Sequence, residues 1–394
     1  MSASFACRLS RPGVVCSLGS DLETIATALF SGQRQLAISD DFTPGRALPL
    51  GRVTRPLPDD RDWESDQRSR NNRLLALALD ALGDALEPLL ARVNPARIGV
   101  VIGTSTSGIG ETERAIAESG QDGPLPASFA YSRQELGAPA RFVAERLGLG
   151  GPCYALSTAC SSSARALASA RRLLKSGQCD AVIAGGADSL CRLTVNGFAS
   201  LDAVSDEPCL PFSRQRRGIN LGEAAALFVV TPERGGIQLS GVGESADAHH
   251  ISAPRPDGSG AVAAMQQALT MAGLAPEAID YLNLHGTGTA LNDQMEATAV
   301  NDLFARPPAC SSTKALTGHT LGAAGALEAA FCWLALTHGR LPRHVYDGDY
   351  DPELPPLPLV GHAPAPNAPP RHALSNSFAF GGNNASLLLS RDDV

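Results

Sequence analysis

Three short apolar runs alternate with helical stretches, and this alternation restricts the possible folds more than any other feature of the chain. The runs are "RIGVVIGTS" at 97–105, "AVIAGG" at 181–186 and "AAALFVV" at 224–230, and each is typical of a buried strand. Ahead of the first run, residues 72–93 place apolar side chains at helical spacing and predict an amphipathic helix. Strands separated by helices indicate an α/β architecture with helices covering the sheets.

A turn-rich segment, "TPERGGI" at 231–237, follows the third run and predicts an internal boundary. We therefore expect an N-terminal half over 1–234 and a C-terminal half over 235–394, which suits a chain of 394 residues. The halves share a local design, because each leads a strand to a candidate reactive residue and then to a helix of small residues. That residue is Cys160 in the first half and His319 in the second.

Composition and charge argue against several classes of protein. No run of about 18 apolar residues is present, and the N-terminus lacks the apolar core of a signal peptide, so we expect no membrane span and a cytoplasmic location. The nine cysteines are scattered without a CxxC pair, which argues against a metal site or a disulfide framework and favours a reducing compartment. A net charge of −8 argues against nucleic acid as a partner.

The segment "STACSSS" at 157–163 sets a single cysteine, Cys160, among hydroxyl residues where a strand-like run gives way to a helix. A thiol at a helix start faces the positive end of the helix dipole and unpaired backbone N–H groups, which favour the thiolate and lower the thiol pKa. The same N–H groups can hold an oxyanion. We therefore predict a nucleophile at Cys160. The alternative is a buried cysteine that only packs, which is the commoner use of a free thiol.

Two histidines lie in glycine-rich turns that suit a reactive site. His285 follows a strand in "LNLHGTGTALND", and His319 precedes a helix in "KALTGHTLGAAGALEAA". A lone histidine is more often structural, but two in such turns beside a candidate nucleophile favour catalysis. Lys314 and Glu328 flank His319 and are either a pair that orients the imidazole or ordinary solvated charges. The glycine-rich loop at 103–113 lacks a nucleotide-binding pattern and predicts a wall of the site.

Four separated segments together resemble the β-ketoacyl-acyl carrier protein synthases of the thiolase superfamily. They are "STACSSS", "HGTGTALND", "KALTGHTLGAAGALEA" and "NSFAFGGNNA", and the resemblance covers nearly the whole chain. Their Cys-His-His set is similar to that of the elongating branch. The resemblance implies a thiolase-like α/β fold, with two similar halves forming a five-layered α-β-α-β-α arrangement. It also implies a homodimer, or a heterodimer with a subunit of the chain-length type.

The same resemblance implies a decarboxylative Claisen condensation. Cys160 would accept an acyl chain, while His285 and His319 would hold the enolate oxygen that forms when a malonyl-acyl carrier protein loses carbon dioxide. The backbone N–H groups of Cys160 and Phe380 would form the oxyanion hole. The other implied roles are supporting ones for Lys314, Glu328 and Asp293, and substrate-binding ones for Thr287, Thr289, Phe380 and Thr106. No cofactor or metal is expected, since phosphopantetheine arrives on the carrier protein.

Three positions depart from the pattern of this family. Ala379 stands where the family has a glycine beside the gating Phe380, and Asn383 replaces a threonine, so we expect the opening of this gate to differ. Thr106 falls where many members line the acyl pocket with an apolar residue. These departures suggest an accessory pathway, such as one to an aryl polyene or another polyketide-like product, rather than housekeeping fatty acid synthesis.

Acyl carrier proteins are acidic, so the docking surface on this chain should carry local positive charge. One candidate cluster lies at the start of the predicted helix and consists of Arg68, Arg70 and Arg73. The other lies in "SRQRRG" and consists of Arg214, Arg216 and Arg217. Either cluster is also compatible with an ordinary solvated surface.

Two other functions stay open at this level. A cysteine-dependent acyl-thioester hydrolase would use Cys160 with one histidine and would leave the second histidine without a task. A chain-length subunit of a heterodimeric ketosynthase would shape a cavity without catalysis, but such subunits typically lack the nucleophile. The chain could also be a catalytic subunit that depends on such a partner.

Overall fold

The fold is built on one mixed sheet of 11 strands, in the order β11-β10-β12-β13-β9-β1-β8-β7-β5-β6, with β2 paired to β8. The computed structural model describes residues 5–120, 123–364 and 368–392. β1 is antiparallel to both β8 and β9, and so joins the strands of the first half to those of the second. β3 and β4 form a separate hairpin.

The strands, in chain order, are β1 Arg8–Leu9, β2 Gly13–Val15, β3 Ala37–Ser39, β4 Leu48–Leu50, β5 Ile98–Gly103, β6 Cys153–Leu156, β7 Ala181–Asp188, β8 Ala224–Thr231, β9 Gly236–Ala246, β10 Tyr281–Asn283, β11 Ala309–Ser311, β12 His372–Ala379 and β13 Asn383–Asp392. The α-helices are α1 Leu22–Ser31, α2 Arg70–Ala81, α3 Gly83–Arg92, α4 Ile109–Ser119, α5 Ala138–Leu147, α6 Ser162–Lys175, α7 Arg192–Ser200, α8 Ser259–Ala272, α9 Ala290–Leu303, α10 Lys314–Thr317 and α11 Ala324–His338.

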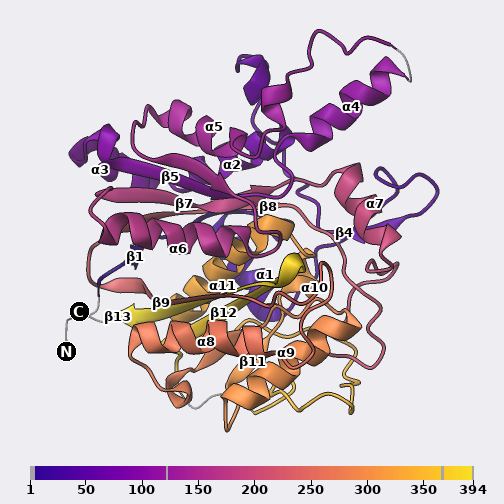
Figure 1. Cartoon of the computed structure of the whole chain (residues 1–394), viewed down its shortest axis with the longest axis vertical. Helices are drawn as coiled ribbons and strands as arrows, with labels where there is room; N and C mark the ends of the chain where they lie inside the picture. The colour runs from indigo at the N-terminus through magenta and orange to yellow at the C-terminus, as the bar shows by residue number, and fades with distance from the viewer. Residues whose placement is uncertain (1–4, 121–122, 365–367, 393–394) are drawn as a thin grey trace.

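The two parts of the sheet form separate layers, with helices between them and outside them (Figure 1). Between the layers, α6 packs against β5 and β7, while α11 packs against β12 and β13 and also against α6. On the outside, α2 and α5 cover the first layer, and α8 and α9 cover the second. The expected five-layered α-β-α-β-α arrangement is confirmed.

The three apolar runs form β5, β7 and β8 as predicted, and every residue of these strands is buried. The prediction of one helix over 72–93 is wrong, since α2 ends at Ala81 and α3 begins at Gly83. The break falls next to Gly83, and glycine weakens the interior of a helix. Pro88, inside α3, also lacks the backbone N–H of a regular helix residue. The apolar pattern of the sequence therefore continues although the helix does not. The chain passes between β8 and β9 over 232–235, and the division of the chain at residue 234 stays a prediction.

One helical stretch is more apolar than we expected from the sequence. Residues 321–338, which include α11, span 18 residues at a mean hydropathy of 1.2 and would be long enough to cross a membrane. Within the fold, 83% of that stretch is buried. Its composition therefore matches a core helix between two sheet layers, which has no solvent face to keep polar.

Candidate active site

Cys160 lies between the end of β6 and the start of α6, where the sequence predicted it. The preceding Ala159 has a φ of +52°, which is uncommon for a residue with a side chain. Hydroxyl groups hold this turn. The Ser162 hydroxyl accepts from the Thr158 N–H at 2.9 Å and donates to the Ala159 carbonyl at 2.5 Å. The Ser161 hydroxyl donates to the Thr158 carbonyl at 2.8 Å. The hydroxyl residues around the thiol thus stabilise a strained turn.

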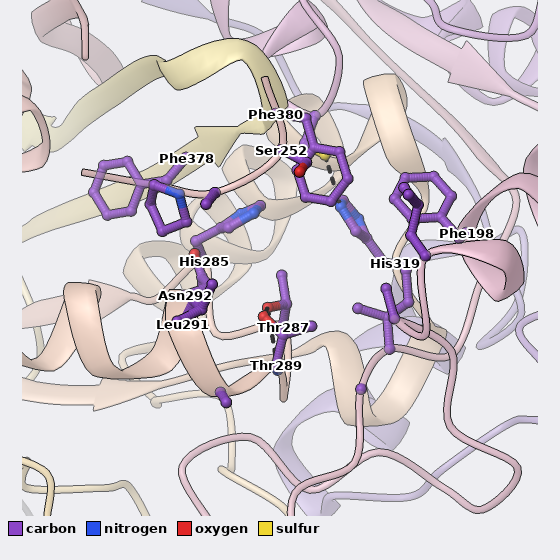
Figure 2. A pocket seen from close by; sticks show the side chains of 18 of the residues that line it. Phe198, Ser252, His285, Thr287, Thr289, Leu291, Asn292, His319, Phe378 and Phe380 are labelled. Atoms are coloured by element: carbon purple, nitrogen blue, oxygen red, sulfur yellow. Dashed lines mark hydrogen bonds between the residues drawn. The ribbon is translucent and has the colours of Figure 1, made fainter. Parts of the chain in front are cut away.

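The second half brings His285 and His319 to this thiol. His319 Nε2 lies 3.0 Å from the Cys160 sulfur. The two imidazole rings stand edge to face with centroids 5.5 Å apart, and Figure 2 shows both pointing into one cavity. The Cys160 sulfur and one ring nitrogen from each of His285 and His319 all lie within 4.8 Å of one another. The structure therefore places together three side chains that the sequence holds in separate segments.

Lys314 and Glu328 form a buried ion pair beside the imidazoles. Lys314 Nζ lies 2.5 Å from Glu328 Oε1, and the side chains are only 2% and 3% exposed. Burial raises the pKa of Glu328, while the charge and the hydrogen bond of Lys314 oppose that rise. The interpretation of these residues as ordinary solvated charges is wrong, because both lie in the interior.

Burial also decides the protonation of the three central groups. Loss of water, and then the charge of Lys314, hold the pKa values of His285 and His319 well below the ordinary value, so both imidazoles are neutral. Loss of water raises the pKa of Cys160 to about 11, although Lys314 and the backbone N–H groups of Phe380 and Cys160 act to lower it. The predicted lowering of this thiol pKa is wrong, because the helix-end argument left out desolvation.

Two buried carboxylates on α9 fix the turn that carries His285. Glu296 accepts the backbone N–H groups of His285 and Gly286, both at 2.7 Å, and burial raises its pKa to about 7. Asp293 accepts the Gly288 N–H at 3.2 Å. Sequence reasoning singled out Asp293 and missed Glu296. Glu296 could have been found from its spacing, because it lies three residues after Asp293 on the same helix and residues three apart share a face.

A cavity of about 440 Å³ has Cys160, His285 and His319 on its wall. Figure 2 shows the two histidines in this lining. Thr287 and Thr289 also line it, and their hydroxyl oxygens lie 2.9 Å apart. The space between the three central groups and these threonines can admit a narrow substrate, with polar contacts available along its length.

Phe380 closes one side of the cavity, with its ring 5.4 Å from that of Phe198 on α7. A second loop holds the Phe380 loop in place, because the Asp247 N–H donates to the Gly382 carbonyl at 2.8 Å. The Asp247 carboxylate in turn accepts from Asn384 Nδ2 at 2.6 Å. Sequence reasoning did not find Asp247, which carries no recognisable pattern in its own segment.

The three positions that depart from the family pattern have different settings. Ala379 is extended, with φ −107° and ψ 156°, so an alanine fits there without strain. Asn383 is the first residue of β13. The effect of either on the gate stays a prediction. Thr106 is fully buried outside the lining of the cavity, and its hydroxyl donates to Asp188 Oδ1 at 2.8 Å. Thr106 thus does not line this cavity, and its role in binding the acyl chain stays a prediction.

The first basic cluster is largely occupied by contacts within the chain. Arg70 Nε donates to the buried Glu223 at 2.8 Å, and Arg73 Nε donates to the Pro58 carbonyl at 2.7 Å. Arg68 is exposed, and its Nε donates to a backbone carbonyl. Much of the positive charge at the start of α2 thus serves the fold.

The second basic cluster lies at the cavity. Arg216 is paired with Asp351 at 2.5 Å, and Arg214 lies 3.9 Å from Asp349. Arg217 is exposed and lines the cavity, and within the described part of the chain no ion pair or hydrogen bond is formed by its side chain. It therefore offers a free positive charge beside the path to Cys160.

Comparisons with known proteins agree with this geometry. The family model "Beta-ketoacyl synthase, N-terminal domain" matches residues 56–234, and "Beta-ketoacyl synthase, C-terminal domain" matches residues 237–346. Nodulation protein E of Rhizobium meliloti is 35% identical over 95% of this chain and 96% of its own length. The 3-oxoacyl-[acyl-carrier-protein] synthase 2 of Staphylococcus aureus is 32% identical over 99% of both chains. A ketosynthase from Xenorhabdus doucetiae, solved in complex with its chain length factor, is 44% identical, with a TM-score of 0.91 over 98% of each chain.

Proposed function

The chain belongs to the β-ketoacyl synthase family and is a β-ketoacyl-acyl carrier protein synthase, and from this premise we propose how its residues divide the reaction. The observation that carries the proposal is the convergence of one thiol and two neutral imidazoles in a single cavity. An acyltransferase of this kind needs a nucleophile for the first step and hydrogen-bond donors for the second.

The first step is thioester exchange at Cys160. The sulfur attacks the acyl carbonyl, the pantetheine thiol leaves with the proton, and an acyl-cysteine forms. The backbone N–H groups of Cys160 and Phe380 hold the carbonyl oxygen while it carries negative charge. Both groups already act on the Cys160 sulfur, which supports their place at the reacting centre.

The second step is decarboxylative condensation. A malonyl thioester enters, its carboxylate leaves as carbon dioxide, and the electrons of the broken bond form an enolate. The enolate carbon attacks the acyl-cysteine carbonyl, the bond between that carbonyl and the Cys160 sulfur breaks, and the 3-oxoacyl chain remains on the carrier protein. The released thiolate takes a proton from solvent, which restores the thiol for the next cycle. A neutral imidazole keeps one N–H, so His285 and His319 can each donate to the thioester oxygen. Two such donors stabilise the developing charge without transferring a full proton. The chain supplies no resident cofactor in this scheme, because the carrier protein brings the phosphopantetheine.

For the partner subunit, we favour a heterodimer with a chain-length-type protein over a homodimer. The relative from Xenorhabdus doucetiae supports this choice, since it was solved with its chain length factor at 44% identity to this chain. The segment between β5 and β6 also exposes four large apolar side chains, which a subunit would cover: Ile116, Leu125, Tyr131 and Leu136. The nine free thiols suit a cytoplasmic assembly.

For the carrier protein, we favour docking at the second basic cluster rather than the first. Arg217 is unpaired among the described side chains and borders the cavity, whereas Arg70 is neutralised by Glu223. An acidic carrier would therefore be drawn to the entrance through which its prosthetic arm must pass. We keep an accessory, polyketide-like pathway, such as one to an aryl polyene, as the proposed setting of this reaction.

The test is a mass measurement on the purified protein, alone and with a candidate chain-length subunit, mixed with acyl carrier proteins bearing different chains. We expect an acyl adduct on Cys160, and an extended product after malonyl carrier is added. The Cys160→Ala variant serves as the control. Release of free acid without any extension would instead support the thioester hydrolase. Absence of any adduct in all mixtures would overturn the assigned role of Cys160.

A further inference from the structure

A fully buried carboxylate, Asp188, lies at the end of β7 and touches none of the three central groups. Its two oxygens serve two different segments. Oδ2 accepts the Gly322 N–H at 2.6 Å. Oδ1 accepts four hydrogen bonds, each at 2.8 Å, from the Ser105 N–H, the Thr106 N–H, the Thr104 hydroxyl and the Thr106 hydroxyl. One side chain thus ties the loop after β5 to the turn that follows His319.

The contact with Gly322 is close enough to require a glycine. A Cβ built at this position would lie 2.8 Å from Asp188 Oδ2 and 2.8 Å from the Ser105 hydroxyl oxygen. The preceding Leu321 has a φ of +53°, an uncommon conformation for a leucine. Strain of this kind persists only where the surroundings fix the backbone, and a charge-assisted hydrogen bond from the next residue provides such a restraint.

His319 depends on its backbone more than a histidine in a reactive site usually does. Such an imidazole is normally oriented by a hydrogen bond on the ring nitrogen that does not face the reacting group. Among the residues that the structure describes, Nδ1 of His319 has no hydrogen-bond partner. Its main chain is held on one side, where the His319 N–H donates to the Asn220 carbonyl at 2.7 Å and the His319 carbonyl accepts the Gly222 N–H at 2.9 Å.

On the other side of His319, the restraint is the bond between Gly322 and Asp188. We infer that Asp188 is a positioning residue for His319. Its hydrogen bond from the Gly322 N–H holds the 320–322 turn, and this keeps His319 Nε2 within hydrogen-bond distance of the Cys160 sulfur. Asp188 acts from the first half of the chain on a residue of the second. This role is independent of the proposed partners and of the acyl chain.

The variant Asp188→Asn separates the two contacts of this side chain. The amide oxygen will take the position of Oδ1, where four donors converge, so the NH₂ group will face the Gly322 N–H. Two donors repel each other, and the turn after His319 will move while the loop after β5 stays bound. Thr104→Val is the matched control, since it removes one donor to Oδ1 and leaves the Gly322 contact intact.

The readout is the rate of alkylation of Cys160 by iodoacetamide at pH 8, followed by peptide mass spectrometry. The exposed Cys153 is the internal reference. An Nε2–H that donates to the sulfur stabilises the thiolate, so losing it should slow alkylation about tenfold. We expect this loss in Asp188→Asn and in His319→Ala, and no further loss when the two are combined. Thr104→Val should react at the wild-type rate.

Additivity of the two changes would overturn the inference, since a merely structural role would act on top of His319→Ala. An unchanged rate in a folded Asp188→Asn protein would overturn it as well. If that variant does not fold, Gly322→Ala tests the same bond from the other side, because its Cβ would push the turn off Oδ2. Loss of the fold in both variants would assign Asp188 to global stability, which also contradicts the inference.

Discussion

In the first half β6 leads to Cys160 and then to α6, and in the second half β11 leads to His319 and then to α11. The surroundings of the two residues differ. The Cys160 turn is held by neutral hydroxyls. In the second half, the Lys314–Glu328 pair lies near His319, and the Asp188 carboxylate binds Gly322, three residues after it. Neutral hydroxyl groups are enough to hold the Cys160 turn, because the start of α6 already supplies backbone N–H groups there. A neutral imidazole in a strained turn needs charged groups, which bind more strongly and cost more to bury.

The largest expected effect comes from replacing Cys160 or His319, because the two residues serve different steps of the reaction. Cys160→Ala removes the nucleophile and should abolish acyl transfer, a loss of about 10³-fold or more. His319→Ala should slow acyl transfer only about tenfold, and should slow decarboxylation of malonyl carrier about 10²–10³-fold, since it removes a donor to the enolate. Separate assays of acyl-enzyme formation and carbon dioxide release measure the two steps. Equal losses in both assays for His319→Ala would contradict this division.

The second prediction concerns the free energy that it costs to bury the Lys314–Glu328 ion pair in the second half of the chain. Lys314→Met leaves Glu328 buried without its partner and should lower the free energy of unfolding by about 3–5 kcal/mol. The double variant Lys314→Met/Glu328→Gln carries no buried charge at this pair and should recover most of that loss. Urea unfolding with a fixed slope measures both. If the double variant is no more stable than the single one, desolvation of Glu328 does not explain the loss.

The third prediction is a pH dependence that belongs to the His285 turn. The folded pKa of Glu296 is about 7, above its ordinary value of 4.5, so the folded chain holds this proton more tightly than the unfolded chain does. The resulting stability is fully present below pH 4.5 and is lost as the pH rises through 7. The buried neutral imidazoles of His285, His319 and His344 act in the opposite direction, because their folded pKa values are lowered.

Comparison with Glu296→Gln isolates the carboxyl group from these histidines. Between pH 4.5 and 7 the wild type should lose about 3 kcal/mol relative to the variant, which has no proton to release. Unfolding by urea at several pH values gives this difference. Amide exchange should place the loosening at 285–289 and not at 157–163. A constant difference across this range would show that Glu296 keeps one protonation state.

The sequence predicted the parts of this molecule that depend on local patterns. The strands β5, β7 and β8 could be found from their apolar runs, and the turns around His285 and His319 from their glycines. The turn at Cys160 could be found because a single cysteine lies among hydroxyl residues where a strand gives way to a helix. Glu296, Asp188 and Asp247 could not be assigned from the sequence, because an acidic residue has no pattern that tells a buried acceptor from a solvated charge. Asp188 and Asp247 bind backbone groups of Gly322 and Gly382, more than a hundred residues away in the sequence. Glu296 binds backbone groups nearer in the sequence, and only its spacing from Asp293 pointed to it.

Errors arose where a local rule ignored its surroundings. The helix-end argument for a low thiol pKa at Cys160 omitted the desolvation that the packed layers impose. From the sequence, the basic cluster at Arg70 could bind an acidic partner. In the fold, Arg70 is paired with Glu223, which lies more than a hundred residues away in the sequence. These results depend on tertiary contacts, which spacing along the chain does not reveal.

The smallest expected effect tests whether the first half is as robust as its neutral contacts suggest. Ser161→Ala removes a hydroxyl that donates to the Thr158 carbonyl at 2.8 Å, and should lower the free energy of unfolding by about 1 kcal/mol. Ser176→Ala, at the end of α6, removes a similar bond to the Leu173 carbonyl and is the control for hydroxyl loss away from the thiol. Because Ser162 still holds the strained Ala159, alkylation of Cys160 should stay within about twofold of the wild-type rate. A loss for Ser161→Ala as large as that for Lys314→Met would show that the hydroxyl network carries as much of the site as the buried charges do.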